Sequence, residues 1–182
     1  MAGKMTGKRS VAFTIGLLLV LYIIQAVPMG ISAALPLSLQ GRGASYKDLA
    51  KFSFASLPFS LKLLWAPVVD TTKLRGHGRR KSWLVPVQLL CSAVMVLAAV
   101  GRWPSKWAGE DGHPIQVGPL TVFFFTLYVL MATQDIAVDG WALEILPVHL
   151  KKHASTCNTI GQSLGFYATN IAFLLFNHSR ND

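Results

Sequence analysis

Two aspartates stand four residues apart, at Asp135 and Asp139, inside an apolar segment over residues 119–146. Residues four apart share one face of a helix, so the two carboxylates are expected to point the same way. A carboxylate at membrane depth is costly to leave unpaired and commonly marks a substrate or proton route. Asp135, one turn deeper than Asp139, is the better candidate for a substrate or proton contact, and two carboxylates this close could share one proton.

A lysine lies inside a second apolar segment, over residues 46–69. Its ammonium group is expected at a depth from which it could reach Asp135. Lys62 precedes Asp70 by eight residues, which places it about 12 Å deeper along a helix. Three interpretations stay open for this ammonium: it snorkels to the interface, it pairs with Asp135, or it faces a cavity that accepts anions. The last would give an anionic substrate a counter-charge.

The segment that follows Asp70 is basic and contains glycine, with Arg79 and Arg80 at its end. A charged carboxylate inside a membrane usually finds a partner, so we expect Asp139 to pair with one of these arginines. Together the four residues are interpreted as a cytoplasmic gate whose ion pairs form in one transporter conformation and break in another. The simpler alternative is that the basic residues only anchor the chain at the membrane surface.

Amide side chains recur at comparable depth in three segments. Asn158 and Gln162 share one face of the segment over residues 154–177. Polar side chains of this kind either bond across to another helix or line a polar route. A route is expected to include further amides from the other segments, which gives the candidate cavity residues Gln25, Lys62, Gln134, Asp135, Asn158 and Gln162.

Five apolar segments must position these residues. A hydrocarbon core of about 30 Å needs about 20 helical residues, and the chain is 52% hydrophobic and only 14% charged. This composition excludes an ordinary soluble surface and favours an all-α membrane protein. The second and fifth segments carry polar residues and are expected to cross the membrane only inside a bundle. The predicted transmembrane helices are residues 11–39, 46–69, 83–101, 119–146 and 154–177.

The positive charge alternates between the two ends of these helices. Three basic residues precede the first helix, five lie between the second and third, and two precede the fifth, making ten, whereas the other connections hold four. The rule that cytoplasmic loops carry more Lys and Arg places residues 1–10 in the cytoplasm and the end segment 178–182 outside or in a lumen. The same placement excludes nucleic acid as the partner of the net charge of +9.

Metal and redox chemistry find little support in the sequence. Cys91 and Cys157 form no Cys-x-x-Cys motif, and the five histidines lie in loops or at helix ends, so we predict no metal and no cofactor. Asp135 and Asp139 do have the spacing of a Mg²⁺-diphosphate site in intramembrane prenyltransferases. That enzymatic alternative lacks the second acidic cluster that would hold another metal.

Five sequence strings together resemble the acetyl-coenzyme A transporter family of the endoplasmic reticulum membrane, within the major facilitator superfamily. They are QAVPMGI at 25–31, PFSLKLLWAPVVD at 58–70, GRRKSWLVP at 78–86, ATQDIAVDGWA at 132–142 and ASTCNTIGQ at 154–162. The resemblance implies a twelve-helix transporter that carries acetyl-CoA from the cytosol into the endoplasmic reticulum lumen.

On this interpretation the chain holds about five helices of the N-terminal lobe. It is expected to be a fragment that does not transport alone, because alternating access needs two lobes. The bilayer and acetyl-CoA are the expected partners, and a homodimer is a further alternative. Bacterial muropeptide permeases share a similar Gly-Arg-Arg loop and aspartate-rich fourth helix, so another anionic solute remains the alternative cargo.

Overall fold

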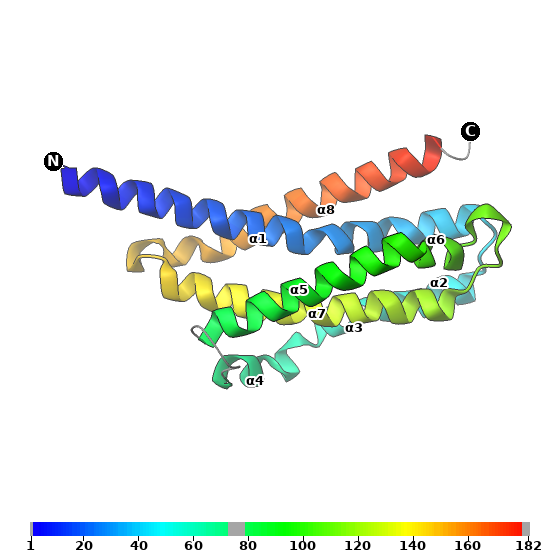
Figure 1. The fold of residues 1–182 in the computed structure, drawn as a ribbon, viewed down its shortest axis with the longest axis horizontal. Helices are drawn as coiled ribbons and strands as arrows, with labels where there is room; N and C mark the ends of the chain where they lie inside the picture. Colours follow the sequence, from blue (N-terminus) through cyan, green and yellow to red (C-terminus); the bar gives the residue numbers. More distant parts are fainter. Residues whose placement is uncertain (1, 73–78, 180–182) are drawn as a thin grey trace.

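The structure is a computed structural model that describes the backbone of residues 2–72 and 79–179, with side chains described for residues 11–72, 80–110 and 112–177. Every regular element in these ranges is helical, as expected for an all-α membrane protein (Figure 1). The elements in chain order are α1 (Ala2–Gly41), α2 (Tyr46–Ser53), η1 (Phe54–Ser56), α3 (Leu57–Ser60), η2 (Lys62–Leu64), α4 (Ala66–Thr71), α5 (Arg79–Gly101), α6 (Trp103–Trp107), η3 (Glu110–Gly112), α7 (Val117–Ile145), η4 (Val148–His153) and α8 (Ala154–Ser179).

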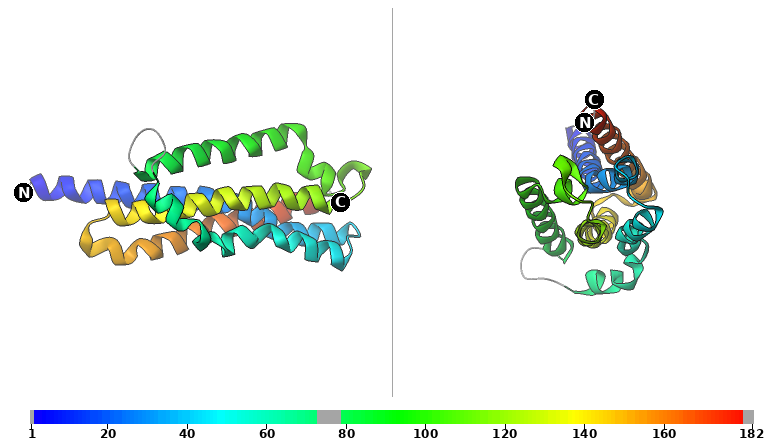
Figure 2. Two further views of the ribbon diagram at one scale, coloured as in Figure 1. Left: turned by 90° about the horizontal axis from the view of Figure 1, so that it is seen from below. Right: turned by 90° about the vertical axis from the view of Figure 1, so that its right-hand side faces the viewer.

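Helix α7 lies at the centre of the bundle. Seen end-on, α1 and α8 lie together on one side of it, α5 on another, and the segment from α2 to α4 on a third (Figure 2). Its residues 131–138 are all buried against the neighbouring helices. The polar side chains of this stretch therefore lie among protein groups, where they need hydrogen-bond partners.

Helices α1 and α8 pack with their backbones in direct contact. A Cβ atom added at Gly161 would lie 2.6 Å from Tyr22 Cβ, and one at Gly165 would collide with the carbonyl oxygen of Ile23. Such small-residue contacts let membrane helices approach closely. The glycine stripe of α8 is thus a packing surface, and it fixes the height of the amide side chains of α8 against α1.

The expectation of a single helix over residues 46–69 is wrong. This stretch consists of α2, η1, α3, η2 and α4 in succession. Pro58 and Pro67 each lie in the first turn of a new helix, where proline is tolerated because its missing N–H has no helical partner there. Pro28 and Pro36, by contrast, lie inside α1 without ending it.

Three helices within the described residues are long and apolar enough to cross a membrane. They are Val11–Gly41 in α1, Arg80–Gly101 in α5 and Val117–Ile145 in α7. The two other predicted spans are the broken segment from α2 to α4 and the more polar α8. Both lie alongside α7 or α1 for much of their length (Figure 2), as expected of segments that need a bundle.

The end of the bundle opposite η4 is held together by one arginine. Arg42 donates to the carbonyl of Ala108 at 3.1 Å, to Asn177 Oδ1 at 2.9 Å and to Glu110 Oε1 at 3.3 Å. These contacts connect the end of α1 with the α6–η3 connection and with the end of α8. The connection over residues 102–116 contains the two short helices α6 and η3.

Candidate functional site

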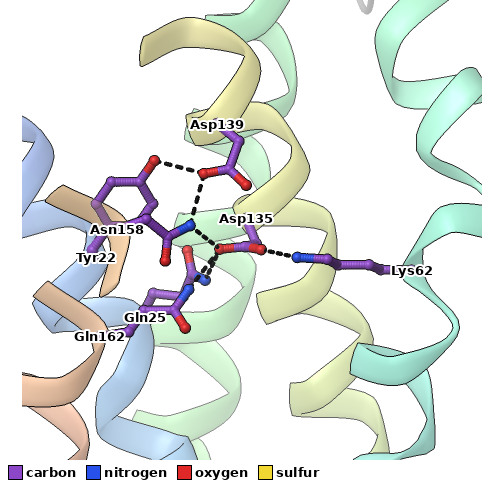
Figure 3. A network of polar contacts seen from close by, with 7 residues as sticks. All are labelled: Tyr22, Gln25, Lys62, Asp135, Asp139, Asn158 and Gln162. Atoms are coloured by element: carbon purple, nitrogen blue, oxygen red, sulfur yellow. Dashed lines mark hydrogen bonds and ion pairs between the residues drawn. The ribbon is translucent and has the colours of Figure 1, made fainter. Parts of the chain in front are cut away.

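Asp135 is the centre of a group of polar side chains in the middle of the bundle. The residue is fully buried, and its Oδ1 accepts hydrogen bonds from Gln25 Nε2 and Gln162 Nε2, each at 2.7 Å (Figure 3). Asn158 Nδ2 lies 3.5 Å from the same oxygen. We call the whole group the polar cluster; its members are Tyr22, Gln25, Lys62, Asp135, Asp139, Asn158 and Gln162.

Lys62 approaches from the side opposite to the amides and forms an ion pair with Asp135 Oδ2 (Figure 3). Of the three interpretations of this lysine, the structure shows the pairing with Asp135. The side chain keeps 28% of its surface exposed, and its ammonium lies 4.9 Å from the centre of the Phe59 ring. Its position on the short η2 turn, between α3 and α4, allows the side chain to reach sideways to α7.

Asp139 has a hydroxyl and an amide as partners. Tyr22 Oη donates to Asp139 Oδ1 at 2.7 Å, and Asn158 Nδ2 donates to the same oxygen at 2.8 Å. The prediction that Asp139 pairs with Arg79 or Arg80 is wrong for Arg80, which bonds elsewhere; the side chain of Arg79 lies outside the described residues. Asp139 faces α1 and α8 because it shares the face of α7 that carries Asp135.

Arg80 instead connects α5 with α4 and with the end of α7. It forms an ion pair with Asp70, and its Nε donates to Glu144 Oε1 at 3.1 Å. The guanidinium packs on the backbone of Gly140, where a Cβ would collide with it. The Asp70–Arg80 contact expected from the sequence is therefore present, with Glu144 in the position where Asp139 was expected.

Gln134 is separated from the polar cluster. It is 4% exposed and lines, with Gln25, a cavity of about 120 Å³ between α1, α5 and α7. Its Nε2 atom has no hydrogen-bond partner among the described residues, and the same holds for Gln25 Oε1. Gln25 thus belongs to both places, because its amide nitrogen donates to Asp135 and its side chain also lines this cavity.

Two functional candidates were missed by the sequence reasoning. Tyr22 lies three residues before Gln25 and so on the same face of α1, but a tyrosine in an apolar helix is hard to tell from a packing residue. Glu144 lies four residues after Gly140, on the face where Arg80 packs. That spacing is a usable signal only once the glycine is known to lie under the arginine.

Comparison with known proteins gives a family. The family model described as acetyl-coenzyme A transporter 1 matches residues 14–181. The chain belongs to this family. The match contains every member of the polar cluster and the Arg80 ion pairs, whereas no solved structure matches the chain at a significant level.

The relatives of this chain include fungal and bacterial proteins. An uncharacterized protein of Schizosaccharomyces pombe is 41% identical over 172 residues, covering 93% of this chain and 31% of the relative. An uncharacterized membrane protein of Saccharomyces cerevisiae is 38% identical over 179 residues, covering 90% and 32%. The anhydromuropeptide permease of Escherichia coli is 25% identical over 146 residues, covering 75% and 28%. The chain therefore spans about a third of the length of the curated relatives it matches.

Proposed function

We propose that this chain forms part of the N-terminal half of a solute transporter that carries acetyl-CoA from the cytosol into the endoplasmic reticulum lumen. The family match supports the choice of cargo. The polar cluster supports transport as the kind of activity. We propose further that the chain crosses the membrane several times with its N-terminus in the cytosol, as the distribution of basic residues favours.

The observation that carries the proposal is the fully buried Asp135 on the central helix of the bundle. Helix α7 supplies the carboxylate, and α1, η2 and α8 each supply a donor to it. Replacing both members of a buried ion pair by apolar residues of similar size often costs no stability, so stability alone does not explain the charges. Ionisable groups kept at membrane depth usually face a substrate or ion path. We therefore propose that the polar cluster lines the substrate path.

Ion pairs at the two ends of the bundle are the proposed gates. Arg80 holds α4, α5 and α7 together at the end where η4 lies, and Arg42 holds α1, α6 and α8 at the other. In alternating access one end opens while the other stays closed. The Arg80 contacts, with Glu144 replacing Asp139 in the sequence-based set, are the proposed cytosolic gate.

The test is uptake of radiolabelled acetyl-CoA by the full-length protein in proteoliposomes. Asp135→Asn should abolish saturable uptake, because it removes the charge on which Lys62 and the amides converge. Asp48→Asn is the matched control, since Asp48 forms a half-exposed pair with Lys51 away from the cluster. Normal uptake by the Asp135 variant, or none by the unaltered protein, would refute the proposal.

A second cargo is favoured by the similarity to the Escherichia coli anhydromuropeptide permease. The same vesicles can be offered a labelled anhydromuropeptide. Saturable uptake of that compound, with no uptake of acetyl-CoA, would transfer the assignment to a muropeptide permease. If the vesicles take up neither compound, transport of both cargoes is refuted.

A further inference from the structure

A cavity of about 620 Å³ lies between η4, the beginning of α8 and the end of α7. Its exposed residues include Lys151 and Lys152 on η4, whereas Asp139 and Asn158 line it from half-buried positions. The lysines therefore stand at the mouth and the two polar-cluster residues at the depth. Because Asp139 and Asn158 line this cavity and are bonded to each other, the cavity reaches the polar cluster. Figure 3 shows these two residues at the edge of the cluster.

The mouth carries positive charge that the described carboxylates do not pair with. No carboxylate within residues 11–72, 80–110 and 112–177 forms an ion pair with Lys151 or Lys152. The hydroxyl-bearing residues Ser155 and Thr159, four apart on α8, line the same cavity. Two ammonium groups beside hydroxyls are a suitable environment for phosphate oxygens, which accept strong charge-assisted hydrogen bonds.

The inner end of the cavity carries a negatively charged group, the carboxylate of Asp139. Among the described side chains, Asp139 is bonded to the uncharged donors Tyr22 and Asn158 and forms no ion pair. Lys62, the lysine of the polar cluster, is already paired with Asp135. A phosphate pushed to this level would meet a carboxylate without a compensating cation. Uncharged amide and hydroxyl groups meet no such repulsion there and find hydrogen-bonding partners.

We infer that this cavity binds the phosphorylated nucleotide end of the cargo at its mouth and directs the uncharged end inward. For acetyl-CoA, Lys151 and Lys152 hold the phosphates, and the acetyl-pantetheine arm, which carries two amides and a thioester, points toward Asp139 and Asp135. This inference rests on the proposed function for the identity of the cargo. The orientation itself follows from the separation of charge between mouth and depth.

The experiment compares inhibitors that carry the complete phosphorylated end, part of it or none of it. Uptake of labelled acetyl-CoA by the full-length protein is inhibited with coenzyme A, with 3′-dephospho-coenzyme A and with acetyl-pantetheine. In the variant Lys151→Gln/Lys152→Gln the inhibition constant of coenzyme A should rise about 100-fold, roughly tenfold for each lost charged hydrogen bond. The inhibition constant of acetyl-pantetheine should change less than twofold, and that of the 3′-dephospho compound should change by an intermediate factor.

The control is Lys47→Gln/Lys106→Gln, which removes the same charge from exposed lysines of the opposite end of the bundle. It should leave all three inhibition constants unchanged. An equal rise for acetyl-pantetheine in the Lys151/Lys152 variant would overturn the orientation. Loss of the variant's effect in vesicles without anionic lipid would overturn it too, because the phosphates bound by the lysines would then be those of lipid headgroups.

A second measurement separates this inference from the proposed function. Adenosine 3′,5′-bisphosphate should protect Lys151 and Lys152 of the reconstituted protein from an amine-acylating reagent, as quantified by mass spectrometry, while Lys47 reacts at an unchanged rate. Protection without any acetyl-CoA uptake would uphold the phosphate site and refute the cargo. Uptake without protection would uphold the cargo and refute the site.

Discussion

The ion pair between Lys62 and Asp135 allows a quantitative test of how the polar cluster is stabilised. We consider Lys62→Met, Asp135→Asn and the double variant in the full-length protein. Removing Lys62 leaves a fully buried carboxylate, and loss of one partner of a buried pair costs about 3–5 kcal/mol. The amide donors of Gln25 and Gln162 remain, so we expect the lower limit, about 3 kcal/mol.

Asp135→Asn should lower the free energy of unfolding by less than Lys62→Met does. Asp135→Asn leaves Lys62 unpaired, but 28% of that side chain is exposed, so the ammonium can reach a wetter position. The loss is then chiefly that of charge-assisted hydrogen bonds, about 2 kcal/mol. The double variant removes both charges together and should lose only about 1–2 kcal/mol, because no ion is left buried without a partner.

The three values give a coupling energy of about 3–4 kcal/mol, at or slightly above the upper limit for residues in direct contact. It can be measured by denaturant unfolding in mixed micelles, followed by tryptophan fluorescence. The double variant should be more stable than Lys62→Met alone, although both lack uptake. Additivity of the two single changes within about 0.5 kcal/mol would show that the pair contributes nothing as a pair, and would refute this account of the cluster.

Three further predictions concern the other contacts. Asp139→Asn should shift the balance of inward-open and outward-open forms without abolishing acetyl-CoA binding, as measured by double electron–electron resonance on the two ends of the bundle; an unchanged distance distribution would contradict it. Gly165→Ala should destabilise the protein by about 1–3 kcal/mol, because the added methyl group meets the α1 backbone. Gly16→Ala, with open space around it, should instead stabilise the protein by about 0.5–1 kcal/mol. Thermal unfolding compares the two variants, and equal effects would argue against the close helix contact. Arg42→Gln should lose about 1.5–3 kcal/mol of charged hydrogen bonds and speed proteolysis in the connection over residues 102–116; an unaltered cleavage rate would show that this residue does not hold that end closed.

The relative height of residues along the bundle could be predicted from the sequence, because each helical residue advances by about 1.5 Å. That simple measure placed Lys62 within reach of Asp135 and Asp70 within reach of the arginines. The periodic amides of α8 were predicted as one polar face for the same reason. The three apolar helices needed only their length and composition.

Direction around a helix could not be predicted in this way. Asp139 lies at a suitable height for Arg80, yet it faces α1 and α8, and Glu144 takes the arginine. The rotation of α7 is set by packing against three neighbours, which no single helix encodes. The breaks in the second span had a sequence signal in Pro58 and Pro67, but Pro28 shows that proline alone does not decide where a buried helix ends.

The backbone contact between α1 and α8 has a consequence for motion. Because Gly30, Gly161 and Gly165 lie directly against the backbone of the facing helix, α1 and α8 have little freedom to slide or separate, and they should move as one rigid body. This helix pair carries four donors of the polar cluster, whereas the two aspartates that accept from them belong to α7. The donors are Tyr22, Gln25, Asn158 and Gln162. Every one of those bonds crosses the same boundary, so a displacement of the helix pair would strain them simultaneously, and the release of the carboxylates would be cooperative, in a single concerted step.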